Sequence, residues 1–404
     1  MKSVTVCLWC QSPKLENIAV RRDGVDIVKC NSCGLFMNQS IPNNPADYYQ
    51  EEYFNSTEDE PDMGYSGEYS LTSPAFLLWQ SAFIAATNTN NDKKHFLEIG
   101  SATGSLLEIV SEQQPELSVS GIDISNYAVE FSRKKGLDAE VAYVQEYTAK
   151  PKKDIIFSSE TLEHLDDLKI FFDGVKKNLS KNGVFLFYVP SIVEKDARAE
   201  GTEYVRFKTK MEHLLHFTPD FFSKELPKYF GVEVLIKEIV SDYGPCILGA
   251  VTSDKKTITS LKTLFSTLDQ ESIPKKMSKD MLIYLAFFSL KFGKSSLSQK
   301  LITNINSSKD FSDKEKSLIG GLACYHSGEL EKATKYFIEL YKLDPGSTVA
   351  LKLLYANQKE LSQIYLEELY KVKTPAPKNQ VHSRLINKVG SRVRRYANKY
   401  RGHS

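Results

Sequence analysis

The sequence predicts an α/β protein with a doubly wound, mostly parallel sheet, a small cysteine-rich module before it and an all-helical region after it. Three observations predict this class. Apolar strand-like segments alternate with helical segments between about residues 95 and 190, four cysteines lie within the first 33 residues, and helical periodicity replaces glycine turns after about residue 253. The 404 residues suffice for two to three domains.

The composition is that of an ordinary globular protein. Hydrophobic residues make up 41% and charged residues 25%, which excludes extended disorder for most of the chain. The longest apolar run, 281–290, is too short to span a bilayer, and the N-terminus lacks the apolar core of a signal peptide. We therefore expect a cytoplasmic protein.

The charge is distributed unevenly along the chain. The formal net charge is +1, which argues against a field that would steer nucleic acid. Residues 369–404 nevertheless carry ten Lys and Arg and no acid, so the preceding residues carry about −9. Apolar residues recur at three- and four-residue steps from Val381 to Tyr400, as in a helix lying on an anionic membrane surface. Docking onto the acidic body and nucleic-acid binding are the alternatives for this tail.

The first four cysteines form two CxxC pairs, Cys7 with Cys10 and Cys30 with Cys33. This spacing presents four thiolates to one tetrahedral zinc ion, and two short strand-like segments flank an Arg-Arg-Asp-Gly turn between the pairs, as in a zinc ribbon. Four thiolates leave no open position for water, so we expect a structural zinc. A disulfide framework is the alternative, which a reducing cytosol disfavours.

A glycine-containing turn lies at the centre of the predicted α/β domain. The segment 95–110 runs from an apolar strand through Gly100 and Gly104 into a helix. A second strand ends in Asp123 about twenty residues later, where a carboxylate can bind both hydroxyls of a ribose. A helix at 127–135, closed by Gly136, and a short strand around 140–144 follow. Ligands of such sheets bind at the carboxyl ends of the strands.

Two further strands complete the predicted sheet. Residues 154–159 are an apolar run, followed by a helix with apolar residues at helical spacing from Leu168 to Leu179 and an aspartate, Asp166 or Asp167, as its N-cap. The Asn182-Gly183 turn introduces a fifth strand at 184–189, which Pro190 ends.

Together these segments resemble the class I S-adenosylmethionine-dependent methyltransferases. The resemblance rests on Leu97-Glu-Ile-Gly-Ser-Ala-Thr-Gly104, Gly121-Ile-Asp-Ile-Ser125, Glu160-Thr-Leu-Glu-His-Leu165 and the Asn182-Gly183 turn, and covers about residues 5–250. With the zinc ribbon, the chain is similar to a bacterial subgroup that modifies sugars or surface glycans. A nicotinamide enzyme is the main competitor, but GxGxxG is absent from the turn.

The resemblance implies a set of cofactor-binding residues. In the family, the first motif makes room for the methionine part of the cofactor, and Ala102 stands where many members have a second glycine. The acid at the end of the second strand binds the ribose, and its neighbour walls the adenine. The residues implied are Glu98, Gly100, Ala102, Gly104, Asp123, Ile124, Tyr143, Val144, Ser159 and Glu160.

Histidines supply the candidate catalytic groups, because a transferase must help to remove a proton from its acceptor and histidine does this near neutral pH. The candidates are His164, His213 and Glu212, with His216 nearby. Sugar C-methyltransferases carry a Glu-His pair at a matching place, together with a tyrosine where this chain has Lys210, so O-methylation is as well supported as C-methylation. The alternative for His164 is a structural hydrogen bond within its loop.

Family resemblance also implies that Tyr53 and Tyr65 fold over the cofactor.

The C-terminal third resembles a tetratricopeptide repeat. Gly321, Gly328, Ala333, Phe337 and Pro345 fall at matching offsets of one 34-residue unit, where small residues permit close helix crossing and the larger one fills the gap. Helices around 281–292 and 349–370 would be its neighbours. Such arrays bind protein partners, and a plain helical cap is the alternative.

These interpretations divide the chain into a zinc ribbon (1–45), a methyltransferase domain (46–252), a helical region (253–374) and a basic tail (375–404). They predict a cytoplasmic enzyme that methylates a sugar or surface glycan, working at the inner face of the membrane. The alternatives are a lipid, quinone or small-metabolite methyltransferase and a non-catalytic adaptor.

Overall fold

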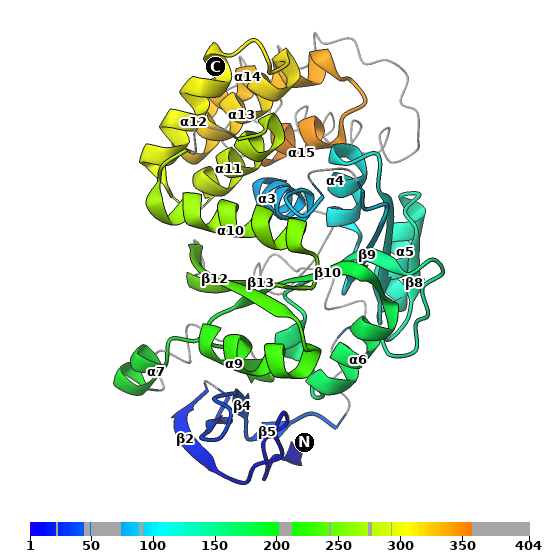
Figure 1. Cartoon of the computed structure of the whole chain (residues 1–404), viewed down its shortest axis with the longest axis vertical. Coiled ribbons are helices and arrows are strands. Elements are labelled where there is room, and N and C mark those ends of the chain that lie inside the picture. Colours follow the sequence, from blue (N-terminus) through cyan, green and yellow to red (C-terminus); the bar gives the residue numbers. More distant parts are fainter. Residues whose placement is uncertain are drawn as a thin grey trace, which may run out of the picture.

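The computed structural model describes residues 1–21, 23–43, 49, 74–88, 92–201, 212–241, 244–273, 277–291 and 293–357. A central sheet lies between the N-terminal module and the C-terminal helices, which occupy opposite ends of the molecule (Figure 1). Among the described helices, none is both long and apolar enough to cross a bilayer.

The central sheet has seven strands in the order β12-β13-β10-β9-β6-β7-β8. Five of them are parallel, and β13 and β12 complete the sheet as an antiparallel hairpin beside β10. The strands are β6 (His95–Ile99), β7 (Ser118–Asp123), β8 (Ala139–Val141), β9 (Lys153–Ser159), β10 (Leu179–Pro190), β12 (Glu233–Ser241) and β13 (Gly244–Thr252). The predicted fold class, a doubly wound and mostly parallel sheet, is confirmed.

Alternate residues of β10 enter two separate cores. Leu186 and Tyr188 belong to the core shared with the C-terminal helices, whereas Phe185 and Phe187 belong to the core shared with the N-terminal module. Successive side chains of a strand point to opposite faces, so a strand covered on both faces is apolar throughout. This explains the unbroken apolar run from which the sequence predicts the strand.

Helices cover both faces of the sheet (Figure 1). Apolar residues of α3 (Pro74–Ala85), α4 (Ser105–Gln113) and α10 (Lys255–Gln270) join the core on the side of the C-terminal region, and those of α6 (Leu168–Asn178) and α9 (Pro219–Phe230) join the core on the side of the N-terminal module. Asp167 caps α6, accepting hydrogen bonds from the backbone amides of Lys169 and Ile170. The shorter helices are α5 (Asn126–Lys134), α7 (Glu194–Glu200) and the 3-10 turn η2 (Leu162–His164).

The N-terminal module is a small antiparallel sheet that borrows a strand from the α/β domain. Its order is β11-β4-β3-β2, in which β11 (Leu215–His216) pairs with β4 (Phe36–Asn38). The hairpin of β2 (Leu15–Val20) and β3 (Asp26–Cys30) is the one expected from the sequence. A further pair, β1 (Lys2–Ser3) with β5 (Ser40–Ile41), closes the module. The backbone ladder therefore joins the two units.

The C-terminal region contains α11 (Lys279–Lys291), α12 (Ser295–Ser307), α13 (Asp313–His326), α14 (Leu330–Leu343) and α15 (Thr348–Ala356). Its helical character is confirmed. Phe337 of α14 packs directly on Gly321 of α13, where an added Cβ would overlap the ring. That contact is the small-to-large packing expected of the repeat-like unit, whose assignment as a tetratricopeptide repeat stays a prediction.

Several elements were not predicted from the sequence. The five predicted strands and the helices between them are present, but the β12–β13 hairpin and helix α3 were missed. The predicted basic tail, Tyr53, Tyr65 and Lys210 lie outside the described residues.

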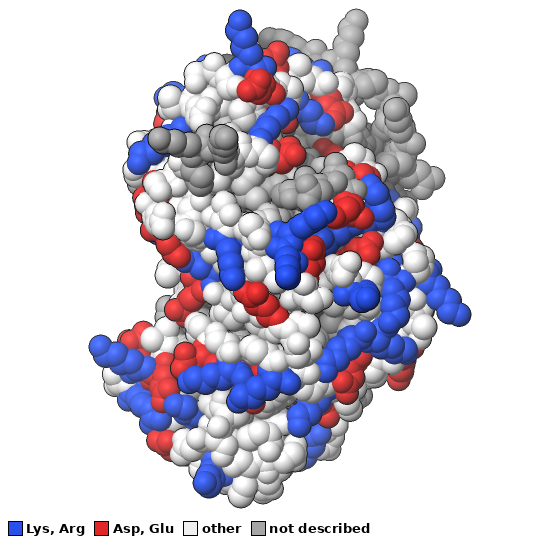
Figure 2. All heavy atoms as spheres, in the orientation of Figure 1, with Lys and Arg blue, Asp and Glu red and all other residues white. Residues whose placement is uncertain are grey.

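On the face drawn in Figure 2, basic and acidic side chains of the described residues are interspersed.

Candidate active site

A pocket of about 410 Å³ opens where the parallel strands β6, β7 and β9 end. Its volume is in the range of small-molecule and cofactor sites, and its place is the one that open α/β sheets use for ligands. The turn after β6, the end of β7, the end of β9 and the start of α3 all contribute to its wall.

The turn after β6 approaches the pocket in a conformation that side chains rarely adopt. Gly100 and Gly104 have φ of 77° and 74°, and Ala102 between them has φ of 44°. A Cβ on Gly100 would overlap the hydroxyl of Thr161, which follows β9. Glycine is therefore required at position 100, whereas Ala102 holds a left-handed conformation at some cost in free energy.

Two carboxyl groups, Glu98 and Asp123, lie buried at the base of the pocket. The Asp123 carboxylate accepts hydrogen bonds from the backbone amides of Ala102 at 2.8 Å and Ser125 at 2.9 Å. Burial, followed by the neighbouring Asp123 carboxylate, raises the pKa of Glu98 to about 8. Burial also raises the pKa of Asp123, against the opposing effect of its backbone amides. A cationic group that enters the pocket would reduce the electrostatic repulsion between these two carboxyl groups.

Three buried polar atoms of the pocket residues have no hydrogen-bond partner within the described structure: Glu98 Oε2, Ser101 Oγ and Ser105 Oγ. Buried polar groups in folded proteins are normally satisfied, so unpaired ones along a pocket indicate a missing polar ligand. A carboxyl group and hydroxyls suit an amino acid with its ammonium and carboxylate groups. These residues fit the methionine part of S-adenosylmethionine.

The end of β9 forms the opposite wall. Ser159 Oγ accepts a hydrogen bond from the amide Nε2 of Gln80 on α3 at 2.7 Å. Glu160 has φ of 48°, a left-handed conformation that is strained for a residue with a side chain, and its amide donates to the carbonyl of Tyr188. Strained residues cluster at functional sites, which is consistent with a role for this corner in ligand binding.

A buried cluster of Glu163, His164 and His213 lies beside the pocket, and His164 also lines it. The rings of His164 and His213 meet edge to face with centroids 4.9 Å apart, and Tyr49 packs against His164 in the same way at 5.8 Å. The backbone amide of Leu214 donates to the carbonyl of Glu163 at 2.7 Å, which ties the loop of His213 to η2. The structure therefore brings together both predicted histidines.

Glu212 and His216, the other two candidates of this loop, do not belong to the cluster. Glu212 is buried, and its backbone carbonyl accepts a hydrogen bond from His164 Nδ1 at 3.3 Å. His216 lies in the N-terminal sheet against Asn38 Oδ1 at 3.1 Å. Burial and the nearby Arg21 lower the pKa of His216 to about 3, so this ring is neutral at ordinary pH and structural.

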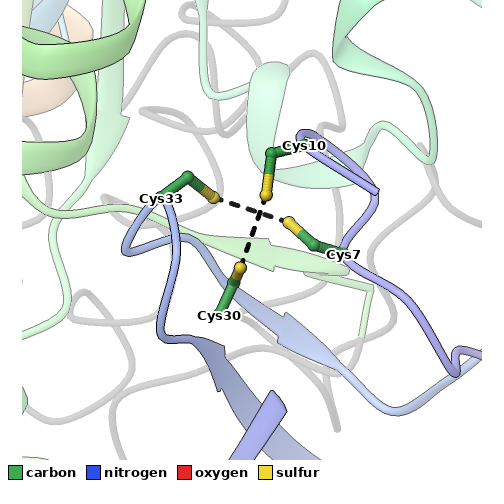
Figure 3. A group of neighbouring side chains, drawn as sticks. All are labelled: Cys7, Cys10, Cys30 and Cys33. Carbon is green, nitrogen blue, oxygen red and sulfur yellow. Dashed lines mark hydrogen bonds between the residues drawn. The ribbon is translucent and has the colours of Figure 1, made fainter. Parts of the chain in front are cut away.

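The four N-terminal cysteines converge on one point (Figure 3). Their sulfur atoms pair as Cys7 with Cys33 and Cys10 with Cys30, each pair 3.5 Å apart, and all four are reduced. A tetrahedral zinc ion with Zn–S bonds of about 2.3 Å separates its sulfurs by roughly 3.8 Å. The hydrogen bond with Cys33 lowers the pKa of the Cys7 thiol to about 5, and burial raises that of Cys10 to about 11. The donor set and its geometry fit zinc.

Most of the pocket lies in a segment that matches a known protein family. Residues 75–235 match the family described as methyltransferase domain. This segment of the chain is a methyltransferase domain. It contains β6 to β10, the glycine turn and both carboxyl groups, so the family assignment and the pocket coincide in the same part of the chain.

Two curated relatives of the methyltransferase domain match the chain over only part of its length. A malonyl-[acyl-carrier protein] O-methyltransferase of Priestia megaterium is 26% identical over 25% of this chain and 39% of its own length. A second such enzyme, of Ilyobacter polytropus, is 28% identical over 32% of this chain and 50% of its own length. The chain thus spans half or less of the length of these relatives.

Two of the solved structures to which the chain is similar are named as methyltransferases. The plantazolicin methyltransferase BpumL, solved in complex with SAH, is 15% identical with a TM-score of 0.37, covering 50% of this chain and 93% of its own. An S-adenosylmethionine-dependent methyltransferase from Clostridium acetobutylicum is 19% identical with a TM-score of 0.34, covering 43% and 90% respectively. Neither likeness bears on the acceptor.

Within the methyltransferase domain, most predicted cofactor residues line the pocket. They are Glu98, Gly100, Ala102, Asp123, Ile124, Tyr143, Val144, Ser159 and Glu160. Gly104 instead precedes α4 as its N-cap, where an added Cβ would contact Leu137 and Ser132. Sequence reasoning missed Phe76, Leu77 and Gln80 of α3, because no turn or polar motif marks that helix.

Proposed function

We propose that the chain is an S-adenosylmethionine-dependent methyltransferase whose acceptor is a polyhydroxylated molecule, a sugar or surface glycan. The observation that carries the proposal is the pocket of the methyltransferase domain, in which the unpaired Glu98 and Ser101 side chains lie near Asp123 at the glycine turn. S-adenosylmethionine supplies an electrophilic methyl group when it is bound. The chain's task is to bind this donor, orient the acceptor and remove one proton.

Each cofactor-binding residue has a distinct part in the proposal. Glu98, with its raised pKa, ionises when it pairs with an ammonium group. Asp123 keeps its carboxylate in place through two backbone amides and offers its remaining lone pairs to ribose hydroxyls. The apolar neighbours Ile124 and Val144 provide a wall for a purine ring, with Tyr143 at the exposed edge.

The acceptor end of the pocket is rich in groups that bind hydroxyls. Beyond the cofactor residues, the wall includes Asn43, Tyr49, His164, Asp166 and Asp167. Carboxylates, amides and phenols hydrogen-bond the hydroxyls of a sugar, and ring faces pack on its apolar side. This composition supports a polyhydroxylated acceptor for either O- or C-methylation.

The histidine cluster is the proton-handling part of the proposal. Because His164 Nδ1 faces a carbonyl oxygen, Nδ1 is the donor, and in the neutral ring Nε2 carries the lone pair. The lone pair lies on the side of Glu163, with Nε2 4.0 Å from Glu163 Oε1. His164, His213 and Glu163 form the proposed catalytic group, and Glu212 orients His164 through its carbonyl.

Two other acceptor classes are distinguishable from a glycan. A malonyl group on an acyl carrier, the acceptor named for the curated relatives, would bring a negative charge to a wall that already holds Glu160, Asp166 and Asp167. A lipid, quinone or other apolar metabolite would offer few hydroxyl groups to the polar side chains of this wall. A non-catalytic adaptor would have no need for the complete cofactor site.

The test is methyl transfer from labelled S-adenosylmethionine to a panel of nucleotide sugars, cell-envelope glycans, a malonyl carrier and quinones, followed by mass spectrometry. The proposal predicts label in a sugar or glycan with the full chain and its loss in Asp123→Asn. Asp138→Asn, an exposed aspartate just before β8, is the matched control and should retain transfer. Label in the malonyl carrier or a quinone alone would overturn the acceptor assignment.

The proposal includes the other parts of the chain. A structural zinc ion on Cys7, Cys10, Cys30 and Cys33 would rigidify the N-terminal sheet. A protein partner for the C-terminal helices and contact of the basic tail with an anionic membrane surface stay predictions from the sequence. Deleting residues 378–404 should abolish flotation of the chain with anionic vesicles, and unchanged flotation would contradict the membrane prediction.

A further inference from the structure

We infer that the chain has a second metal site, separate from the four cysteines, in which Glu163, His164 and His213 bind one borderline divalent cation such as Zn²⁺. Each side chain can offer one ligand atom, and these atoms lie within 4.8 Å of one another. Two imidazoles and one carboxylate form a ligand set that proteins use for catalytic zinc and for non-haem iron.

The burial of the cluster favours an ion. Glu163 is 1% exposed, and the two histidines are 9% and 8% exposed. A carboxylate taken out of water is costly unless a positive charge compensates it, and a divalent cation does this while using the lone pairs of both imidazoles. Two nitrogen ligands also exclude Mg²⁺ and Ca²⁺ as the preferred ions, because these cations prefer oxygen.

The hydrogen bonds around the cluster resemble the outer shell of a metal site. His164 donates its Nδ1 hydrogen to the Glu212 carbonyl at 3.3 Å, which leaves the Nε2 lone pair on the side of Glu163. In metal-binding histidines, the N–H of the second ring nitrogen commonly donates a hydrogen bond to a carbonyl in this way, which fixes the tautomer and the ring orientation. The neutral tautomer of His164 is therefore the one that can bind a cation.

The backbone holds the three ligands in place. The carbonyl of His213 accepts from Asn38 Nδ2 at 2.9 Å and from Arg21 at 3.2 Å. Leu214, the next residue, donates to the carbonyl of Glu163. Ligand atoms around a tetrahedral zinc ion lie roughly 3.4 Å apart, so the ligand atoms of the cluster would have to approach one another by up to about 1.4 Å to bind the ion.

The ion would lie at the margin of the proposed acceptor site, because His164 belongs both to the cluster and to the pocket wall. Any effect of the ion on an acceptor hydroxyl rests on the proposed function. In that case the ion, held by the cluster, would polarise the hydroxyl and ease loss of its proton, in place of a single imidazole acting as base. Binding of the ion itself does not depend on that function, so the two can fail separately.

The test is the zinc content and the Co²⁺ absorption spectrum of the full chain after loading with the metal alone. Glu163→Gln and His213→Gln should each contain one equivalent less zinc than wild type. His216→Gln, which removes a buried histidine of the same region that faces Asn38, is the matched control and should keep the wild-type content. Circular dichroism of each variant reports whether it is folded.

The Co²⁺ spectrum separates the two sites without relying on a variant. The cysteine site should give thiolate-to-metal charge transfer, and the second site should add ligand-field bands without it. Loss of those added bands in Glu163→Gln, with binding of S-adenosylmethionine retained in calorimetry, supports the inference. A wild-type spectrum with thiolate-bound Co²⁺ alone, and a zinc content that Glu163→Gln leaves unchanged, would overturn it and leave the proposed methyl transfer intact.

Discussion

Asn38 of the cysteine-rich N-terminal sheet donates a hydrogen bond from Nδ2 to the backbone carbonyl of His213, with the two atoms 2.9 Å apart. Its own backbone amide donates to the carbonyl of Leu214, and its Oδ1 faces His216. One asparagine thus holds three residues of the loop that carries a candidate catalytic histidine. The N-terminal module therefore forms part of the scaffold of the candidate active site.

Replacing Asn38 with Ala should disturb the acceptor side of the site and leave the cofactor side unchanged. The change leaves buried groups of the loop without their partner, which costs about 1–3 kcal/mol in the free energy of unfolding. We expect a lower kcat with unchanged Kd for S-adenosylmethionine. Asn17→Ala removes an exposed asparagine of the same sheet, bonded to Asp26, and is the control. Equal kcat in both variants would contradict the scaffold role.

Glu98 should make both stability and cofactor binding depend on pH. Its pKa in the folded chain is about 8, above the ordinary value of 4.5, so between these values the folded chain retains a proton that the unfolded chain has released. The contribution of this group to the free energy of unfolding therefore falls as pH rises from about 5 to 8, by up to about 1.4 kcal/mol per pH unit.

The measurement is denaturant unfolding near pH 5 and near pH 8 in wild type, in Glu98→Gln and in the control Glu146→Gln, which changes an exposed acid of the same domain. Glu98→Gln should flatten the pH dependence, and the control should not. Binding of S-adenosylmethionine should also release a proton near neutral pH, seen by calorimetry in buffers of different ionisation enthalpy. Identical pH profiles for all three proteins would refute the role of Glu98.

Positions 100 and 102 of the glycine turn should respond in opposite ways to exchange of Gly and Ala. Ala102 has φ of 44°, so Ala102→Gly relieves strain and should raise the free energy of unfolding by about 0.5–1 kcal/mol with cofactor binding retained. Gly100→Ala would place a Cβ on the Thr161 hydroxyl and should abolish binding. Destabilisation by Ala102→Gly in chemical denaturation would contradict this account of the turn.

Lys352 of α15 should stabilise the contact between the C-terminal helices and the methyltransferase domain. Its Nζ lies 3.0 Å from Glu108 Oε2 on α4, and Lys135 lies at the same distance. Burial alone would raise the pKa of Glu108, and the two lysines outweigh it and lower that pKa. The stabilisation is therefore present above the ordinary carboxyl pKa and is lost as pH falls below it.

Lys352→Met should lower the free energy of unfolding by roughly 3 kcal/mol, because it removes one partner of a buried ion pair. Lys342→Met, which alters an exposed lysine near Glu339 on α14, should change it by less than about 0.5 kcal/mol. Urea unfolding at neutral pH compares the two, and equal stability would show that the buried contact does not join the domains.

The sequence allowed the central sheet and most of the cofactor side to be predicted. Strands buried on both faces, such as β10, are continuous apolar runs, and the turn from Gly100 to Gly104 has a fixed spacing to Asp123. The resemblance to the methyltransferases, which rests on these motifs, implied nine residues that line the pocket. The β12–β13 hairpin was missed because nothing in its local pattern sets the antiparallel pairing beside β10.

The acceptor side depends on contacts between segments far apart in the sequence. His164 and His213 are 49 positions apart, and they meet because β11 pairs with β4 of the N-terminal module. Gln80 reaches Ser159 only once α3 packs on the sheet. No local motif marks these contacts, so the sequence identified the histidines as candidates without showing that Glu163 lies close to both or that His216 belongs to the other sheet.

The central claim, that the pocket at the glycine turn binds S-adenosylmethionine, is tested most directly by calorimetric titration of the full chain with this cofactor. The account predicts a saturable heat for wild type and for the exposed-site control Asp138→Asn, and its loss in Asp123→Ala. A wild-type titration without detectable heat, or an Asp123→Ala titration that matches wild type, would contradict it.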